Sequence, residues 1–403
     1  MNLLWGFFGI IVVLGIAFLF SNGKKSINLR TIVGGLIIQL LFAFIVLKWE
    51  AGKVGLIWFS DKVQNVINYA QDGVAFLFGP AADTEGFGFV FAFQVLTIII
   101  FFSSLISVLY YLGIMQWVIR LIGGGLSKLL GTSRAESVSA AANIFVGQTE
   151  APLVIRPFLA NMTKSELFAV MTGGLASIAG SVLAGYALLG VPLEYLIAAS
   201  FMAAPAGLVM AKIFFPETEK SDVGDFEMEK DQESVNVIDA AARGAGDGLK
   251  LALNVGAMLL AFVALIALVN GMLGGVGKWF GFESLTLEGI LGVLFSPLAF
   301  AIGVPWSEAV TAGSFIGQKL VLNEFVAYAA FAPEIPVLSP KTVIVVSFAL
   351  CGFANLSSLA ILLGGLGALA PSRRPDIARL GIRAVAAGML ASLLSAAIAG
   401  MFI

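Results

Sequence analysis

The chain has 403 residues, of which 59% are hydrophobic and only 12% are charged. Soluble domains carry about 25% charged residues, so this composition excludes a soluble domain and indicates an integral membrane protein. A net charge of −2 without a concentrated basic face argues against a nucleic-acid partner. The lack of histidine, with Cys351 as the single cysteine, excludes Ser-His-Asp chemistry, zinc-histidine sites and intrachain disulfides.

Eight apolar segments are long enough to cross a membrane as helices. Their lengths suit a hydrocarbon core about 30 Å thick, and their residues do not alternate as those of barrel strands do. The first segment has neither the basic start nor the cleavage site of a signal peptide, so we expect it to be retained. The predicted spans are 3–20, 31–48, 88–112, 165–189, 193–214, 246–273, 340–368 and 377–402.

Three other regions are apolar but do not have the pattern of simple spans. In 55–79, apolar residues recur at helical spacing with polar residues between them, which predicts an amphipathic helix at the membrane interface or against another domain. Regions 133–160 and 302–332 are interrupted by glycine, proline and polar residues. Irregular backbone at membrane depth must be buried in protein or line a cavity, so each is predicted to be a re-entrant helical hairpin.

The two predicted hairpins share a motif, Phe-Val-Gly-Gln at 145–148 and Phe-Ile-Gly-Gln at 315–318. Each is followed by a span rich in small and polar residues, and three spans separate the two units, which gives them opposite orientations. Inverted repeats of this kind are typical of secondary transporters, which bind substrate near the membrane midplane between interrupted helices. The predicted fold class is therefore an all-α polytopic membrane protein with eight transmembrane helices, two re-entrant hairpins in an inverted repeat, and interfacial helices.

Basic residues predict the orientation in the membrane. They cluster after the first, third and seventh spans, which places these loops in the cytoplasm and both termini outside. The expected organisation is 1–112 mainly scaffold helices, 113–214 the first hairpin and following spans, 215–245 an acidic cytoplasmic linker, 246–285 a scaffold helix, and 286–403 the second hairpin with the last two spans.

Two carboxylates, Glu150 and Glu324, lie one in each predicted hairpin. A charge at the bilayer centre costs about 2.5–3.5 kcal/mol on insertion scales, so two in matched positions indicate a functional pair. The structural alternative is that Glu150 caps a hairpin tip and that Glu324 pairs with Lys319.

Neutral polar residues accompany the carboxylates. Asn355 and Ser358 are three residues apart, on one face of a helix, and with Glu324 they form a set suited to the vicinal diol of a ribose. Gln148 and Thr149 combine donors and acceptors, which suits the edge of an amide or heterocycle. The alternative for such residues is helix packing, which we prefer for Ser357. Two short oxygen donors, Asn143 and Ser177, are candidates for holding a monovalent cation together with nearby carbonyls.

At these residues the chain resembles the concentrative nucleoside transporters. The run 317–328, GQKLVLNEFVAY, matches their G-x-K-x-x-x-N-E-F-V-A-Y signature, and 147–153, GQTEAPL, matches their first hairpin. The resemblance covers essentially the whole chain and is closest to bacterial members, which lack the extra N-terminal helices of animal relatives.

The resemblance implies a homotrimer in the inner membrane, with a scaffold part and a transport part that moves like an elevator in each protomer. It implies import of nucleosides such as uridine, cytidine and adenosine, coupled to sodium, with no other cofactor. Base contacts are implied for Gln148, Thr149 and Glu150, ribose contacts for Glu324, Asn355 and Ser358, and pocket positions for Gly147, Val182 and Phe353. A sodium site is implied at the side chains of Asn143 and Ser177 and the carbonyls of Val146 and Ile178.

Four alternatives remain open at this point. A proton could replace sodium as the coupling ion, and a sodium-coupled amino-acid or dicarboxylate carrier would also use paired hairpins, although an anionic substrate would need a buried cation such as Arg156 or Lys319. A membrane-embedded enzyme would have only the two carboxylates as acid and base, so we predict that the protein is not an enzyme. A passive channel fits inverted hairpins less well than alternating access does.

Overall fold

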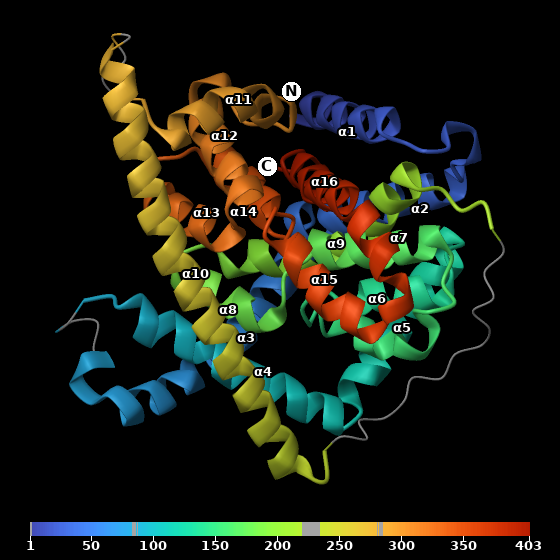
Figure 1. The fold of residues 1–403 in the computed structure, drawn as a ribbon, viewed down its shortest axis with the longest axis horizontal. Helices are drawn as coiled ribbons and strands as arrows, with labels where there is room; N and C mark the ends of the chain where they lie inside the picture. The colour runs from blue at the N-terminus through green and yellow to red at the C-terminus, as the bar shows by residue number, and fades with distance from the viewer. Residues whose placement is uncertain (1, 83–85, 87, 220–233, 280, 282–284) are drawn as a thin grey trace.

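The computed structural model describes all residues except 1, 83–85, 87, 220–233, 280 and 282–284 (Figure 1). The described residues form helices and no strand, which confirms the predicted all-α class. Most of the acidic stretch in the predicted cytoplasmic linker falls on 220–233 and therefore lies outside the described residues.

Seven helical segments of the described chain are long and apolar enough to cross a membrane. Seven of the eight predicted spans correspond to them, and the remaining one, 340–368, consists of two shorter apolar helices. The seven segments are Asn2–Leu19, Leu29–Lys48, Ala92–Tyr111, Lys164–Leu188, Leu193–Phe214, Val237–Trp279 and Pro371–Ala399.

The buried centre of the molecule is built on α9 (Leu193–Phe214) and α16 (Arg374–Ala399), which are buried along most of their length. Helices α1 (Asn2–Leu19) and α2 (Leu29–Ala43) pack against this pair. A π-helical turn, Phe44–Lys48, extends α2. The two termini lie close together (Figure 1). The Asn2 side chain donates a hydrogen bond to the carbonyl of Ile403. Both ends of the described chain therefore lie on the same face, which agrees with an even number of spans when the broken span 340–368 is counted as the eighth.

Helix α10 (Val237–Trp279) runs along one side of the molecule, beside α4 (Thr97–Tyr111) (Figure 1). It has 43 residues and begins nine residues before the predicted span 246–273. Glycines allow the close contact with α4: a Cβ at Gly244 would lie 2.6 Å from Ser107 Cβ, and one at Gly248 would lie 2.7 Å from Ser103 Cβ. The sequence around these glycines has the composition of a linker, but its small residues serve helix packing.

Helix α3 (Glu50–Phe78) projects from the lower left of the molecule in Figure 1. It includes the amphipathic helix predicted at 55–79. Its buried residues, Ser60, Ile67, Ala70 and Val74, lie on one face, and most of the rest of the helix is exposed.

Both predicted hairpins are present. The first consists of α6 (Arg134–Ala142) and the 3₁₀ segment Ala151–Phe158, and the second of α12 (Trp306–Val321) and α13 (Glu324–Phe331). Two helices that precede them were not assigned from the sequence. These are α5 (Ile114–Leu130), which packs on α6, and α11 (Leu287–Ala301), which packs on α12 after a bend of 116°.

Two spans are broken in the middle. The first consists of α7 (Lys164–Ala176) and α8 (Gly180–Leu188), and the second of α14 (Pro340–Leu350) and α15 (Ser358–Leu369). Each break is bonded to the preceding hairpin: Gly180 N donates to Phe145 O at 2.9 Å, and Leu356 N donates to Leu320 O at 3.1 Å. The breaks are also bonded to each other, because Phe353 N donates to Ser177 O at 3.0 Å.

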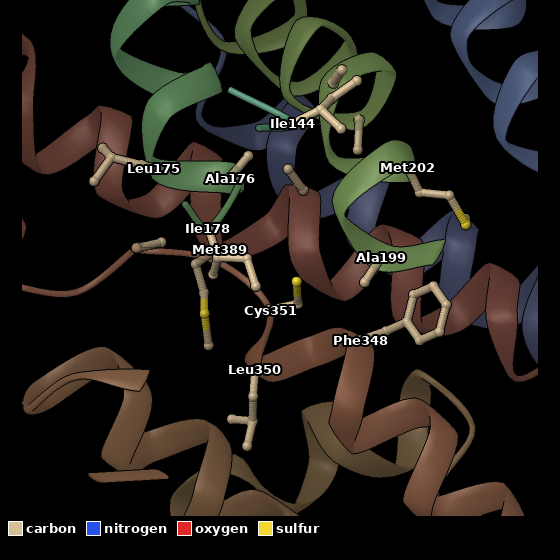
Figure 2. Close-up of a cluster of buried hydrophobic side chains, with 14 of the residues drawn as sticks. Ile144, Leu175, Ala176, Ile178, Ala199, Met202, Phe348, Leu350, Cys351 and Met389 are labelled. Carbon is tan, nitrogen blue, oxygen red and sulfur yellow. The ribbon is translucent and has the colours of Figure 1, made fainter. Parts of the chain in front are cut away.

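Apolar side chains pack around the meeting point of the two breaks. Figure 2 shows Ile178 from the first break and Cys351 from the second among side chains of α7, α9, α14 and α16, including Leu175, Met202 and Met389. This packing holds irregular backbone away from lipid, as unpaired peptide groups at membrane depth require.

Candidate substrate and ion site

A pocket lies where the two hairpins, the two breaks and α10 meet. All nine residues that the sequence analysis assigned to the substrate line this pocket. They come from four separate parts of the chain. The lining residues are Gly147, Gln148, Thr149, Glu150, Ala179, Val182, Leu251, Val255, Met258, Leu259, Asn323, Glu324, Phe325, Phe353, Asn355, Ser357, Ser358 and Ile361.

Glu324 is the first residue of α13, so its carboxylate lies at the positive end of a helix. One carboxylate oxygen accepts a hydrogen bond from the Tyr186 hydroxyl and the other accepts one from Asn355 Nδ2, both at 3.1 Å. The side chain is 5% exposed. Each oxygen has a further lone pair, so the group retains capacity to accept hydrogen bonds from a ligand.

Asn355 is fixed in one orientation. Its Oδ1 accepts from the backbone N–H of Ser358 at 2.8 Å and from the Ser357 hydroxyl at 2.7 Å, which leaves Nδ2 for Glu324. Ser358 in turn lies within 3.5 Å of Gln148 Nε2. This weak contact joins the second break to the tip of the first hairpin.

Lys319 does not pair with Glu324, so that structural alternative is wrong. Its ammonium group is fully buried and donates to Ala349 O at 2.8 Å and to Ser392 Oγ at 3.1 Å. Ala349 lies in the last turn of α14, where helix carbonyls lack intrahelical partners. The lysine therefore stabilises the C-terminal end of a half-helix.

Glu150 accepts a hydrogen bond from the backbone N–H of Gly147, which closes the turn at the first hairpin tip. The predicted capping role is thus present, and the same side chain also lines the pocket. A Cβ at Gly147 would lie 2.7 Å from the Glu150 carboxylate, so a larger residue here would displace that carboxylate. Thr149 rests on α15, where a Cβ at Gly365 would lie 2.6 Å from its methyl group.

The predicted sodium ligands are buried next to this pocket. Asn143, Val146, Ser177 and Ile178 are each at most 5% exposed. Asn143 Nδ2 donates to Ser139 O at 2.9 Å, and Asn143 Oδ1 is buried with no hydrogen-bond partner among the described residues. The Ser177 hydroxyl donates to Gly173 O at 3.1 Å, so its lone pairs stay free to accept. A buried amide oxygen without a donor and a hydroxyl oxygen that can still accept are both suitable ligands for a hard monovalent cation.

Three groups of residues in or next to the pocket lining were not found from the sequence. Tyr186 bonds to Glu324 across 138 residues, and no local pattern marks it. Asn323 directly precedes Glu324 in the signature motif, and this position was the one feature in the sequence that could have identified it. The apolar wall from α10 is Leu251, Val255, Met258 and Leu259, which are indistinguishable in the sequence from lipid-facing residues.

Family models match nearly the whole chain. Models described as "Na+ dependent nucleoside transporter" match residues 8–81 for the N-terminus and 195–400 for the C-terminus, and one described as "Nucleoside recognition" matches 92–193.

Similar proteins include an uncharacterised transporter, YutK, of Bacillus subtilis, 63% identical over all of both chains. The nucleoside permease NupC of Helicobacter pylori is 54% identical over 98% of this chain and 96% of its own. Among solved structures, CNTnw in an inward-facing substrate-bound state is 58% identical, with a TM-score of 0.96 over 100% of this chain and 98% of that chain. The chain therefore belongs to the concentrative nucleoside transporter family, whose members are permeases and not enzymes.

Proposed function

We propose that the protein imports nucleosides across the bacterial inner membrane and is driven by a sodium gradient. The observation that carries the proposal is the set formed by Glu324, Asn355 and Ser358, in which a carboxylate, an amide and a hydroxyl converge on one wall of the pocket. This set suits the hydroxyls of a ribose. Gln148, Thr149 and Glu150 on the opposite hairpin would then contact the base, and Gly147, Val182 and Phe353 would line the space between.

The proposed ion site consists of the side-chain oxygens of Asn143 and Ser177 and the carbonyls of Val146 and Ile178. The unpartnered, buried Asn143 Oδ1 supports this assignment, because an amide oxygen without a donor is stabilised by a cation. The four proposed ligands supply only neutral oxygens, which suit sodium, and none of them can itself carry a proton. Sodium is for this reason preferred to a proton.

For the transport step we propose that one part of each protomer moves past another in an elevator motion. Helices α4 and α10 pack chiefly on each other, and with α3 they would form the scaffold. Helices α1 and α2 pack on α9 and α16, so the proposal assigns them to the moving part. This revises the prediction that 1–112 is mainly scaffold. We also propose that the protein is a homotrimer, as the family resemblance implies. Both termini are proposed to lie outside, as the basic loops indicate.

The dicarboxylate-carrier alternative is disfavoured by the position of its cation. Lys319 bonds to the end of α14 and to Ser392, and neither Lys319 nor Arg156 lines the pocket. A neutral, polar substrate fits the pocket better than an anion does.

The test is uptake of radiolabelled uridine into proteoliposomes with and without an inward sodium gradient. We expect uptake that rises with the gradient and is reduced by unlabelled cytidine and adenosine. Counterflow, in which internal unlabelled uridine accelerates entry of label, separates a carrier from a channel. Gradient-independent uptake that responds to a proton gradient would instead support proton coupling, and absence of nucleoside uptake would refute the substrate assignment.

A further inference from the structure

Asn323 lies between the two arms of the second hairpin, directly before Glu324. It is the N-cap of α13, and its Oδ1 accepts a hydrogen bond from Val326 N at 2.9 Å. The amide orientation is fixed by this bond, because the backbone N–H requires an acceptor. The Nδ2 group must therefore point away from the helix end.

The Nδ2 group of Asn323 has no partner among the described residues. The side chain is 4% exposed and lines the pocket. Helix capping explains only half of this side chain. Serine, threonine or aspartate caps a helix as well, without burying an unsatisfied amide donor. A second function for the donor half would explain why asparagine occupies this position.

The neighbouring groups indicate what this donor would meet. Within the described part of the pocket, the buried side-chain atoms without partners are one acceptor, Gln148 Oε1, and one donor, Asn323 Nδ2. The amide of Asn355 is already committed on both sides, to Glu324 and to Ser358. Asn323 therefore supplies an uncommitted donor next to a carboxylate that only accepts.

A sugar hydroxyl matches this pair of groups. It can donate its proton to a Glu324 oxygen, and its own oxygen then needs a donor, which Asn323 Nδ2 supplies. We propose that Asn323 is a specificity-determining residue that donates a hydrogen bond to a ribose hydroxyl of the bound nucleoside. This inference rests on the proposed function, since it requires a nucleoside in the pocket.

The experiment is a cycle of protein variants and substrate analogues. Uridine and its 2′-deoxy, 3′-deoxy and 5′-deoxy analogues compete for binding of radiolabelled uridine to purified protein in saturating sodium. The variants are Asn323→Asp, which keeps the cap and replaces the donor by an acceptor, and Asn323→Ser, which keeps the cap without adding charge. The control is Asn28→Ser, because Asn28 caps α2 in the same way, by accepting from Arg30 N at 2.9 Å, and does not line the pocket.

We expect wild type to bind at least one deoxy analogue about tenfold more weakly than uridine, the effect of one lost hydrogen bond. Both Asn323 variants should bind uridine about tenfold more weakly, and the penalty for that same analogue should shrink, since the contact it lacks is already gone. Asn28→Ser should behave as wild type.

Unchanged penalties for all three analogues in both Asn323 variants would overturn the inference and leave Asn323 as a helix cap only. Uridine affinity equal to wild type in both variants would also overturn it. Failure of the wild type to bind uridine would refute the proposed function itself, so the two failures are distinguishable. Thermal unfolding of each variant in detergent confirms that the compared proteins are folded.

Discussion

Replacing Glu324 by glutamine removes one negative charge from the pocket and keeps the shape of the side chain. The hydrogen bonds around it can be retained. Asn355 cannot turn over, because its Oδ1 is held by Ser358 N and Ser357 Oγ, so the new amide oxygen must face Asn355 Nδ2. The new amide nitrogen then faces the Tyr186 hydroxyl, which can accept as well as donate.

The expected loss is therefore in binding and not in folding. A hydrogen bond to a charged group contributes about 1.5–3 kcal/mol, and losing it corresponds to roughly 10- to 150-fold weaker uridine binding. Loss of the charge at the start of α13 adds about 0.3–1 kcal/mol of destabilisation, a small shift in the unfolding temperature.

The assay is equilibrium binding of uridine and of free uracil in saturating sodium, with thermal unfolding as the control for folding. The matched variant is Glu308→Gln. Glu308 is also a carboxylate in the first turn of a hairpin helix, accepts hydrogen bonds from Ser339, and lies outside the pocket. We expect it to retain uridine affinity. If Glu324→Gln binds uridine like wild type, or if uracil competes with wild type as well as uridine does, Glu324 does not hold the ribose.

Three further predictions concern the ion site, the orientation and the scaffold. Asn143→Ala should raise the sodium concentration for half-maximal uptake, and an unchanged sodium dependence would place the ion elsewhere. In a background without the native cysteine, Val337→Cys should react with an impermeant thiol reagent only from outside, and Asn161→Cys only from inside. Both residues are exposed and therefore accessible to the reagent. Reaction of both from the same side would contradict the inverted repeat. Gly244→Leu should lower the unfolding temperature in detergent because its Cβ would meet α4, with a loss of about 1–3 kcal/mol. Gly246→Leu, whose Cβ meets nothing within 4 Å, should not.

The residues that line the candidate site could be predicted because polar and glycine residues at membrane depth are informative. A carboxylate in an apolar region such as that of Glu150 or Glu324 is costly where it faces lipid. Its presence therefore indicates irregular backbone that is buried in protein or lines a cavity. The hairpins and the carboxylate, amide and hydroxyl set followed from that reasoning together with the signature motif.

Other features could not be predicted because they depend on contacts between distant segments. The start of α10 is rich in glycine and charge, the composition of a linker, yet Gly244 and Gly248 are there to fit against α4. Helix α5 was not predicted because its sequence contains three consecutive glycines, which disfavour a helix. One of them, Gly123, is on its buried face. The alternative in which Lys319 pairs with Glu324 is wrong because the two residues lie on different arms of the hairpin. The turn between α12 and α13 separates their side chains although they are close in sequence.

The bond between the two breaks has a consequence for how such a carrier can change over evolution. Phe353 N donates to Ser177 O, so the link between the proposed ion ligands and the proposed substrate wall runs through backbone atoms. Side chains at 177 and 353 can be exchanged without removing it. Under the proposed function, ion preference and substrate range can therefore change independently, because each depends on its own side chains. The coupling of the two binding equilibria, which must be equal in both directions, would depend on a link that such changes leave in place.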